Sequence, residues 1–193
     1  MAGHRAATGR TPALGGRYQP WEDRVELLVI RHGVAEDREA FAATGKDDSL
    51  RPLTKEGRWK MEKVAKGLRR VLPSITVIAT SPFTRALQTA RIVADAYGEV
   101  EIEQLDALTP DGTPRAFMAW LREREPDARV AIVGHEPHLG SLISWMLTGE
   151  AAEGRIAMRK GGACMLQIDD RPRAGKATLI WSMTPSILRR VAD

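Results

Sequence analysis

Residues 25–33 read Val-Glu-Leu-Leu-Val-Ile-Arg-His-Gly, a short apolar run that ends in an arginine, a histidine and a glycine. A run of this kind is apolar enough to be buried on both faces, as the strands of parallel sheets are. Similar runs recur at 75–80 and 129–133, with segments of helical spacing between them. This alternation is typical of βαβ units. The sequence therefore predicts an α/β fold of three layers, with a mainly parallel sheet and helices on both of its faces.

Weaker signals complete the predicted sheet. An alternating run at 100–103 predicts an edge strand, and runs at 162–168 and 177–183 flank a turn region rich in Pro and Gly, which predicts a hairpin at the end of the sheet. The polar segment 35–51 is predicted to be a long loop, and loops of that length often border a site. Apolar residues at helical spacing, with Thr54 as the N-cap of the first segment, predict four helices. They cover 55–72, 83–97, 114–124 and 137–148.

The composition limits the class of protein. The chain has 193 residues, of which 43% are hydrophobic and 28% charged, so it is long enough for one globular domain with a sizeable core. Its net charge is +4, but three arginines precede the first acidic residue, so 18–193 carries only +1. That balance leaves no dense basic face and disfavours binding to nucleic acid. We expect 1–20, which contains several Gly and Pro, to be a flexible extension and 21–193 to form a single domain.

Two further features bear on where the protein acts. No apolar run reaches the roughly 18 residues that a membrane span requires, and the N-terminus has no hydrophobic signal core. Cys164 is the only cysteine, so an intrachain disulfide is excluded and a reducing compartment fits. The sequence thus predicts a cytoplasmic protein without a membrane partner.

Three unusual clusters follow three of the predicted strands. They are Arg-His-Gly at 31–33, Ser-Pro-Phe-Thr-Arg at 81–85 and Gly-His-Glu-Pro at 134–137. The carboxyl ends of parallel strands meet at the edge where open α/β sheets bind their ligands. Ser81 is predicted to be the N-cap of the next helix with Pro82 at its first position, and Pro137 is predicted to open the helix after the third cluster. Two helix N-termini therefore point their free N–H groups at one region, which should attract an anion.

The residue types in these clusters indicate which anion. In-line phosphoryl transfer spreads negative charge over three oxygens, and the guanidinium groups of Arg31 and Arg85 are suited to bind them, with a protonated His135 as a third donor. His32 is the natural nucleophile, because a neutral imidazole can accept a phosphoryl group. Gly33 allows the backbone to approach the ligand closely. The predicted phosphate contacts are Arg31, Gly33, Ser81, Arg85 and His135.

These clusters resemble those of a known family. The Arg-His-Gly, the Ser-Pro-x-x-Arg-Ala-x-Gln-Thr-Ala at 81–90 and the Gly-His at 134–135 are similar to the motifs of the histidine phosphatase superfamily, and the likeness covers nearly all of 25–193. Three other stretches resemble the small SixA-type phosphohistidine phosphatases of that superfamily: Arg51-Pro52-Leu53-Thr54, Leu108-Thr109-Pro110 and Trp181-Ser182-Met183-Thr184-Pro185.

The resemblance carries several implications. It implies a phosphoglycerate mutase-like fold, with His32 as the nucleophile, Arg31 and Arg85 as phosphate ligands and His135 as the second histidine of the site. It also implies a reaction with no metal, and we expect no other cofactor.

One stretch departs from the pattern of the family. Many members carry an acidic glutamate in a Leu-x-Glu setting after the fourth strand, whereas this chain has Ala107 at the comparable position. The general acid stays open between Asp106, Asp111, Glu136 and no residue at all. A phosphorylated imidazole is a better leaving group than an alkoxide, so a missing acid would impair hydrolysis of phosphohistidine less than hydrolysis of an ester.

The spacing of the motifs points to the kind of substrate. Only 49 residues separate Arg85 from His135, and the predicted elements leave little chain for a lid. An open site suits a phosphorylated side chain on a partner protein better than a small sugar phosphate. We therefore predict a metal-independent phosphatase that acts on a phosphohistidine-containing phosphotransfer protein in signal transduction. A phosphatase of small phosphate esters and a non-catalytic phosphoprotein-binding module are the alternatives.

Overall fold

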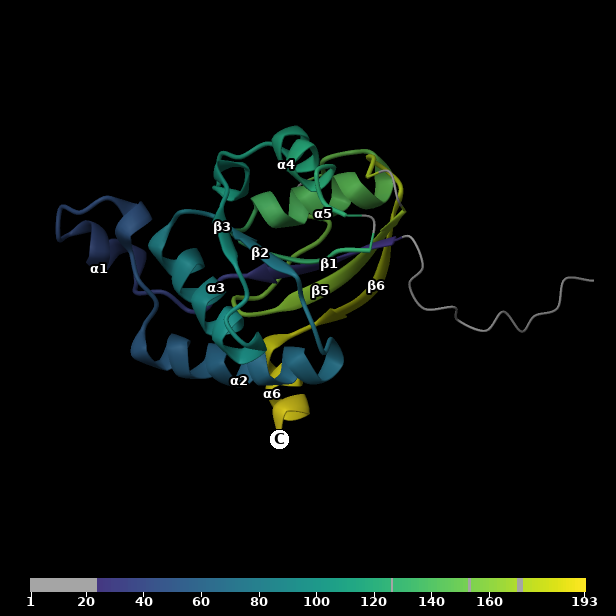
Figure 1. Cartoon of the computed structure of the whole chain (residues 1–193). Helices are drawn as coiled ribbons and strands as arrows, with labels where there is room; N and C mark the ends of the chain where they lie inside the picture. Colours follow the sequence, from purple (N-terminus) through teal and green to yellow (C-terminus); the bar gives the residue numbers. More distant parts are fainter. Residues whose placement is uncertain (1–23, 126, 153, 170–171) are drawn as a thin grey trace, which may run out of the picture.

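A computed structural model describes residues 24–125, 127–152, 154–169 and 172–193 (Figure 1). The flexible extension predicted over 1–20 lies outside the described residues. The described chain forms a six-stranded sheet with the strand order β3-β2-β4-β1-β5-β6. The strands are β1 (Arg24–Arg31), β2 (Val77–Thr80), β3 (Ile102–Gln104), β4 (Arg129–Gly134), β5 (Ala163–Asp169) and β6 (Ala177–Met183).

The pairing of the strands follows the prediction. The strands β1, β2, β3 and β4 are parallel to one another. In the sheet β1 lies beside β4, β4 beside β2 and β2 beside β3. β5 runs antiparallel to β1 and β6 antiparallel to β5, so the predicted terminal hairpin and the predicted edge strand are both confirmed. Because β1 and β4 are adjacent and parallel, the residues that follow them emerge side by side at one edge of the sheet.

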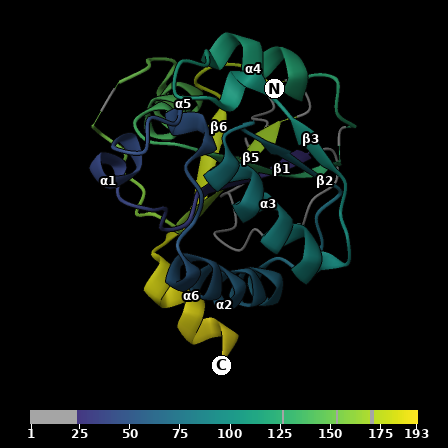
Figure 2. The ribbon, with the colours of Figure 1, turned by 90° about the vertical axis from the view of Figure 1, so that its left-hand side faces the viewer.

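Helices cover both faces of the sheet, which confirms the three-layer α/β prediction (Figures 1 and 2). Along β1 the side chains alternate between two cores: Val25, Leu27 and Val29 pack in one, and Leu28 and Ile30 in the other. The first core includes residues of α4 and α5, and the second includes residues of α2, α3 and α6. The helices are α1 (Arg38–Ala42), α2 (Lys55–Val71), α3 (Thr84–Tyr97), α4 (Pro114–Leu121), α5 (His138–Thr148) and α6 (Pro185–Ala192).

Some local predictions were wrong. The segment 35–51 is not a plain loop, because it contains α1 and a 3-10 turn, η1 (Asp48–Leu50). The side chains of Asp37 and Asp47 cap these two short elements by accepting backbone N–H groups. Ser81 is not the N-cap of α3, since Phe83 holds that position. Two further elements were not predicted, namely α6 and a second 3-10 turn, η2 (Asp106–Leu108).

Two glycines let α2 approach the backbone of its neighbours closely. A Cβ atom on Gly57 would overlap the carbonyl oxygen of Val34, and one on Gly67 would overlap that of Leu188. Thr54 caps α2 as predicted, with its hydroxyl accepting the amide of Gly57. The start of α2 is thus fixed against the backbone that leaves β1.

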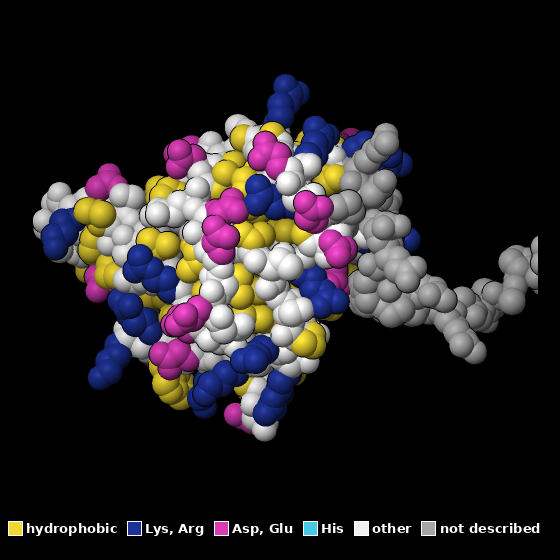
Figure 3. All heavy atoms as spheres, in the orientation of Figure 1, with side chains coloured by type: hydrophobic (Ala, Val, Ile, Leu, Met, Phe, Trp, Pro, Cys, Tyr) yellow, Lys and Arg dark blue, Asp and Glu magenta, His cyan; other side chains and the backbone are white. Residues whose placement is uncertain are grey.

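The surface and the helix lengths add two observations. On the face shown in Figure 3, Lys and Arg side chains are interspersed with Asp, Glu and apolar side chains, unlike the dense basic face that nucleic-acid binding requires. In the part of the chain that the structure describes, no helix is both long and apolar enough to cross a membrane.

Candidate active site

A cavity of about 560 Å³ lies at the carboxyl ends of β1 and β4. Four of the predicted site residues line it, namely Arg31, His32, Arg85 and His135. Arg31 ends β1, Arg85 lies in the first turn of α3, and the two histidines directly follow β1 and β4. The topology therefore brings together side chains that are far apart in the sequence.

His32 is held in one tautomer. Its Nδ1 lies 2.7 Å from the carbonyl oxygen of Gly33. Since a carbonyl oxygen only accepts, Nδ1 must carry the proton, and Nε2 keeps its lone pair. Burial lowers the pKa of His32 to about 3, and the positive charges of Arg85 and Arg31 act in the same direction. His32 is therefore a neutral imidazole at physiological pH, which is the form that can attack phosphorus.

His135 lies next to His32, with the two ring centroids 5.0 Å apart. Its Nε2 is 2.9 Å from the hydroxyl oxygen of Ser81, and the ring of Phe83 packs against it edge-on. Burial, together with the nearby His32 and Arg85, lowers the pKa of His135. The structure therefore does not support a His135 that is protonated before an anion binds, because a second buried positive charge beside Arg85 is unfavourable.

Ser81 and Gly33 lie beside the cavity and contact its residues. Ser81 is fully buried, and its hydroxyl contacts His135 and accepts the amide of Phe83. The amide of Gly33 donates to the hydroxyl of Thr89. Both backbone and hydroxyl groups are thus used to hold the two histidines, and direct contacts of Ser81 and Gly33 with phosphate stay predictions.

The two predicted arginines are anchored in different ways. Arg31 donates from Nη1 to the carbonyl of Met158 at 2.6 Å. Arg85 donates from Nη1 to the carbonyl of Asp48 at 2.8 Å and forms an ion pair from Nη2 to the Asp48 carboxylate at 3.1 Å. The Nε atoms of both arginines are buried without a hydrogen-bond partner among the described residues. Each guanidinium therefore keeps N–H groups that can donate hydrogen bonds to a phosphate.

Sequence reasoning missed several charged residues of this cavity. Arg38, Arg51 and Lys160 also line it. Burial lowers the pKa of Lys160, and four arginines lower it further, the two strongest contributions coming from Arg31 and Arg51. Five cationic side chains thus converge on one cavity. Arg51 could have been found from the stretch 51–54, which carries part of the family likeness, but Lys160 lies in a loop without any recognisable motif.

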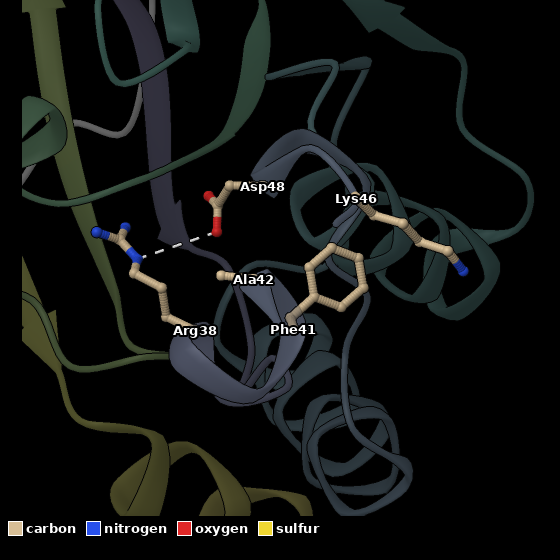
Figure 4. Close-up of a pocket in the computed structure, with 5 residues that line it drawn as sticks. All are labelled: Arg38, Phe41, Ala42, Lys46 and Asp48. Atoms are coloured by element: carbon tan, nitrogen blue, oxygen red, sulfur yellow. Dashed lines mark ion pairs between the residues drawn. The ribbon is translucent and has the colours of Figure 1, made fainter. Parts of the chain in front are cut away.

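A second cavity of about 320 Å³ adjoins the first one on the side of α1. Arg38 lines both cavities, and Phe41, Ala42, Lys46 and Asp48 line the second. Figure 4 shows the carboxylate of Asp48 turned toward the guanidinium of Arg38, at an N–O distance of 3.9 Å. Asp48 therefore lies behind the arginines rather than inside the first cavity.

The candidate general acids are not placed alike. Asp106 and Asp111 do not line the cavity, and Ala107 is buried. Glu136 lines it, but both of its carboxylate oxygens accept backbone amides, from Met158 at 2.9 Å and from Gly140 at 3.3 Å. These bonds indicate that Glu136 holds the loop that carries Lys160.

Comparison with known proteins identifies the family. The model of the histidine phosphatase superfamily (branch 1) matches residues 27–109. The chain is also 36% identical over 148 residues to an uncharacterised protein of Picosynechococcus sp., across 72% of this chain and 87% of that protein. This chain belongs to the histidine phosphatase superfamily.

Two relatives refine the comparison. The phosphohistidine phosphatase SixA of Escherichia coli K12 is 29% identical over 168 residues, across 86% of this chain and 97% of SixA. A solved structure of the protein histidine phosphatase SixA complexed with tungstate matches with a TM-score of 0.71 and 29% identity, covering 84% of this chain and 99% of that one. A phosphoglycerate mutase from Plasmodium falciparum shares the fold, with a TM-score of 0.58. These likenesses confirm the phosphoglycerate mutase-like fold and support phosphatase activity.

In this histidine phosphatase superfamily member, five of the polar side chains that line the cavity are cationic. Among the described residues, no group of three or more His, Cys, Asp or Glu is placed to hold a metal ion. Cys164 is buried, and burial raises the pKa of its thiol to about 12, so it is a protonated core residue. The histidine pair and the arginines remain the groups that can act on a phosphoryl group.

Proposed function

We propose that this protein hydrolyses phosphohistidine on a partner protein, with His32 as the nucleophile and a single domain over 21–193 carrying the activity. In the first step Nε2 of His32 attacks phosphorus while the P–N bond of the substrate breaks, and the released imidazole takes a proton from solvent. In the second step water attacks the phosphorylated His32, which releases inorganic phosphate and regenerates the enzyme. Arg31, Arg85 and His135 are assigned to the phosphoryl oxygens.

The observation that carries the proposal is the fixed tautomer of His32. The bond from Nδ1 to the Gly33 carbonyl leaves Nε2 unprotonated in a cavity lined by Arg31 and Arg85. A neutral nucleophile and preorganised positive charge are the two requirements of phosphoryl transfer to histidine. A tungstate complex of the related SixA fits this assignment, since tungstate is an oxyanion like phosphate.

Two features favour a P–N bond over a phosphate ester. The position of the expected glutamate is occupied by the buried Ala107, and Glu136 is engaged with backbone amides. An imidazole leaves more readily than an alkoxide and depends less on a strong general acid. The likeness to SixA supports the same substrate class, and a phosphotransfer protein of a cytoplasmic signalling pathway is the partner that we propose.

The test compares protein and small-molecule substrates. Phosphate release is measured from a histidine-phosphorylated phosphotransfer protein and from a panel of sugar phosphates, with EDTA present, for the wild type and His32→Ala. We expect release from the protein substrate, and a loss of at least ~10⁴-fold in the variant because its nucleophile is gone. The phosphorylated intermediate should be trapped on His32 by rapid acid-free quenching and mass spectrometry.

Other results would change the assignment. Release from sugar phosphates alone would replace the proposal by an ester phosphatase that uses the same nucleophile. Binding of the phosphorylated protein without turnover, unchanged in His32→Ala, would show a binding module.

A further inference from the structure

Asp48 is the common partner of three arginines at the edge of the cavity. Its carboxylate accepts from Nε of Arg51 at 2.7 Å and pairs with Nη2 of Arg85 at 3.1 Å, and Arg38 lies 3.9 Å away. Its backbone carbonyl accepts a second bond from Arg85, at 2.8 Å. The side chains of Arg85 and Arg51 are 3% and 7% exposed, whereas that of Asp48 is 40% exposed. Two buried cations thus converge on one half-exposed anion.

We propose that Asp48 is the positioning residue of this active site, which orients Arg85 for the phosphoryl group and balances the charge of the arginine cluster. The proposal rests on the proposed function of the same cavity. Asp48 itself does not line that cavity, so its role is exerted through Arg85 and Arg51 rather than by contact with the substrate.

The contact geometry explains how orientation is achieved. Arg85 meets Asp48 through both terminal nitrogens, one on the carbonyl oxygen and one on the carboxylate. Two contacts fix the plane of a guanidinium group, which a single contact leaves free to rotate. The ring of Phe83, 5.0 Å from the guanidinium carbon, supports the same plane from another side. The remaining N–H groups of Arg85 are then held ready for phosphate.

The second role of Asp48 is to balance the positive charge of the three arginines. Burial opposes the ionisation of Asp48, but the hydrogen bond from Arg51 and the charge of Arg85 outweigh it and hold the pKa of Asp48 below its ordinary value. Asp48 is therefore an anion among Arg38, Arg51 and Arg85, which would otherwise repel one another. Glu36 and Asp37 line the same cavity, but among the described residues neither carboxylate forms an ion pair with these arginines.

The proposal makes a specific kinetic prediction. Removal of the Asp48 charge makes the cavity more positive, so the affinity for inorganic phosphate should stay within about threefold of wild type or become tighter. Turnover should nevertheless fall, because misplacing a catalytic group by about 1 Å can cost on the order of 10²-fold. We expect kcat to fall about 10- to 100-fold in Asp48→Ala.

The experiment is a double-mutant cycle. We would measure kcat, KM and inhibition by inorganic phosphate for the wild type, Asp48→Ala, Arg85→Ala and the double variant. If Asp48 acts through Arg85, its removal should change kcat less than about threefold once Arg85 is absent. Asp47→Ala is the matched control, since Asp47 is the neighbouring acid of the same turn and caps η1 through the Ser49 amide without contacting an arginine.

A second variant guards against an effect on folding. Asp48→Asn has nearly the same shape, keeps one oxygen acceptor and lacks the charge, so its kcat should lie between those of the wild type and Asp48→Ala, with an unchanged melting temperature. Equal kcat in the wild type and both Asp48 variants would overturn the proposal. So would a double variant whose loss of kcat equals the product of the losses in Asp48→Ala and Arg85→Ala. Such results would leave the proposed function intact as long as Arg85→Ala alone loses activity. If Arg85→Ala is fully active, the proposed phosphate site fails together with the role of Asp48.

Discussion

The candidate active site is built from two regions of different character. One is the strand-end region, where His32 and His135 follow β1 and β4, are almost fully buried and are fixed by hydrogen bonds to Gly33 and Ser81. The other is the segment 35–51, which contains two short helical elements and contributes charged side chains that are exposed or half-buried, apart from the buried Arg51. In the proposed function the strand-end region supplies the nucleophile, and the segment supplies much of the surrounding charge.

The two regions differ in how firmly their side chains are held in place. Strands in the middle of a sheet are packed on both sides, so the side chains that follow them are placed accurately. Short helical turns with few buried residues open locally at a lower cost in free energy than central strands do. Of the residues in α1 only Phe41 is buried, and η1 has no buried residue. We therefore expect substitutions in the two regions to affect different kinetic steps.

Among the substitutions that compare the two regions, the largest effects are expected for the two arginines of the proposed phosphate site. Arg31→Ala and Arg85→Ala should each reduce kcat/KM for a phosphohistidine protein by ~10² to 10⁴-fold, because each removes a preorganised donor from the developing charge. Arg31 is anchored in the strand-end region and Arg85 is anchored on the segment 35–51. Arg91→Ala is a matched control on the exposed side of α3 and should remain within twofold of wild type.

The comparison of the two variants tests the division of tasks. Losses below threefold for both Arg31→Ala and Arg85→Ala would overturn the assigned site. A large loss for Arg31 and a small one for Arg85 would confine catalysis to the strand-end region and leave the segment a structural role.

A smaller but direct measurement concerns the proton of His32. Burial and the neighbouring arginines lower its pKa from 6.5 to about 3, so its imidazole should not titrate between pH 5 and 8. An unfolded His32 takes up a proton near pH 6.5, whereas the folded one does not. Its burial therefore contributes stability above pH 6.5, and this contribution is lost as the pH falls from 6.5 toward 3.

NMR of ring-labelled histidine checks this prediction, with assignment by His32→Gln. A His32 that titrates near pH 6.5 in the folded protein would show that solvent or an anion stabilises the imidazolium, and the neutral nucleophile would then have to be generated by proton transfer.

Much of the fold follows from local sequence patterns. The buried strands and the helices α2 to α5 were predicted because continuous apolar runs and apolar stripes dominate their local energetics. The helix α6 was missed because it is only 8 residues long and has one buried residue, Leu188, which packs on α2 opposite Gly67. No pattern within such a short segment reports a contact with a helix more than 100 residues earlier.

The site was predictable only where its residues sit in strand-end motifs. The four predicted residues that line the cavity all belong to such motifs, and the topology of a parallel sheet brings strand ends together. Asp48 carries no comparable signal, since an acid in a polar segment is ordinarily a solvated residue. Its importance arises from ion pairs with arginines that lie 3 and 37 residues away in the sequence, and only the folded chain reveals them.

The smallest effect is expected for Glu36→Gln, which tests whether the segment 35–51 also supplies a proton to the leaving group. Glu36 lines the cavity, and its carboxylate forms no hydrogen bond or ion pair within the described part of the chain, whereas Asp37 and Glu136 accept backbone amides. Among the described carboxylates that line the cavity, Glu36 is therefore the one whose substitution tests for acid assistance to the leaving group. For a phosphohistidine substrate we expect Glu36→Gln to lower kcat less than about threefold, because the departing imidazole needs little acid assistance.

An aryl or alkyl phosphate should be affected more strongly, since general acid catalysis contributes on the order of 10²-fold or more to the departure of poor leaving groups. The ratio of the two effects is thus a direct measure of substrate class. Glu39→Gln, on the exposed surface of α1, is the control for a change of charge in the same segment. A loss above tenfold with phosphohistidine would show that the segment takes part in proton transfer, and the two regions would then share the chemistry that we assign to the strand ends alone.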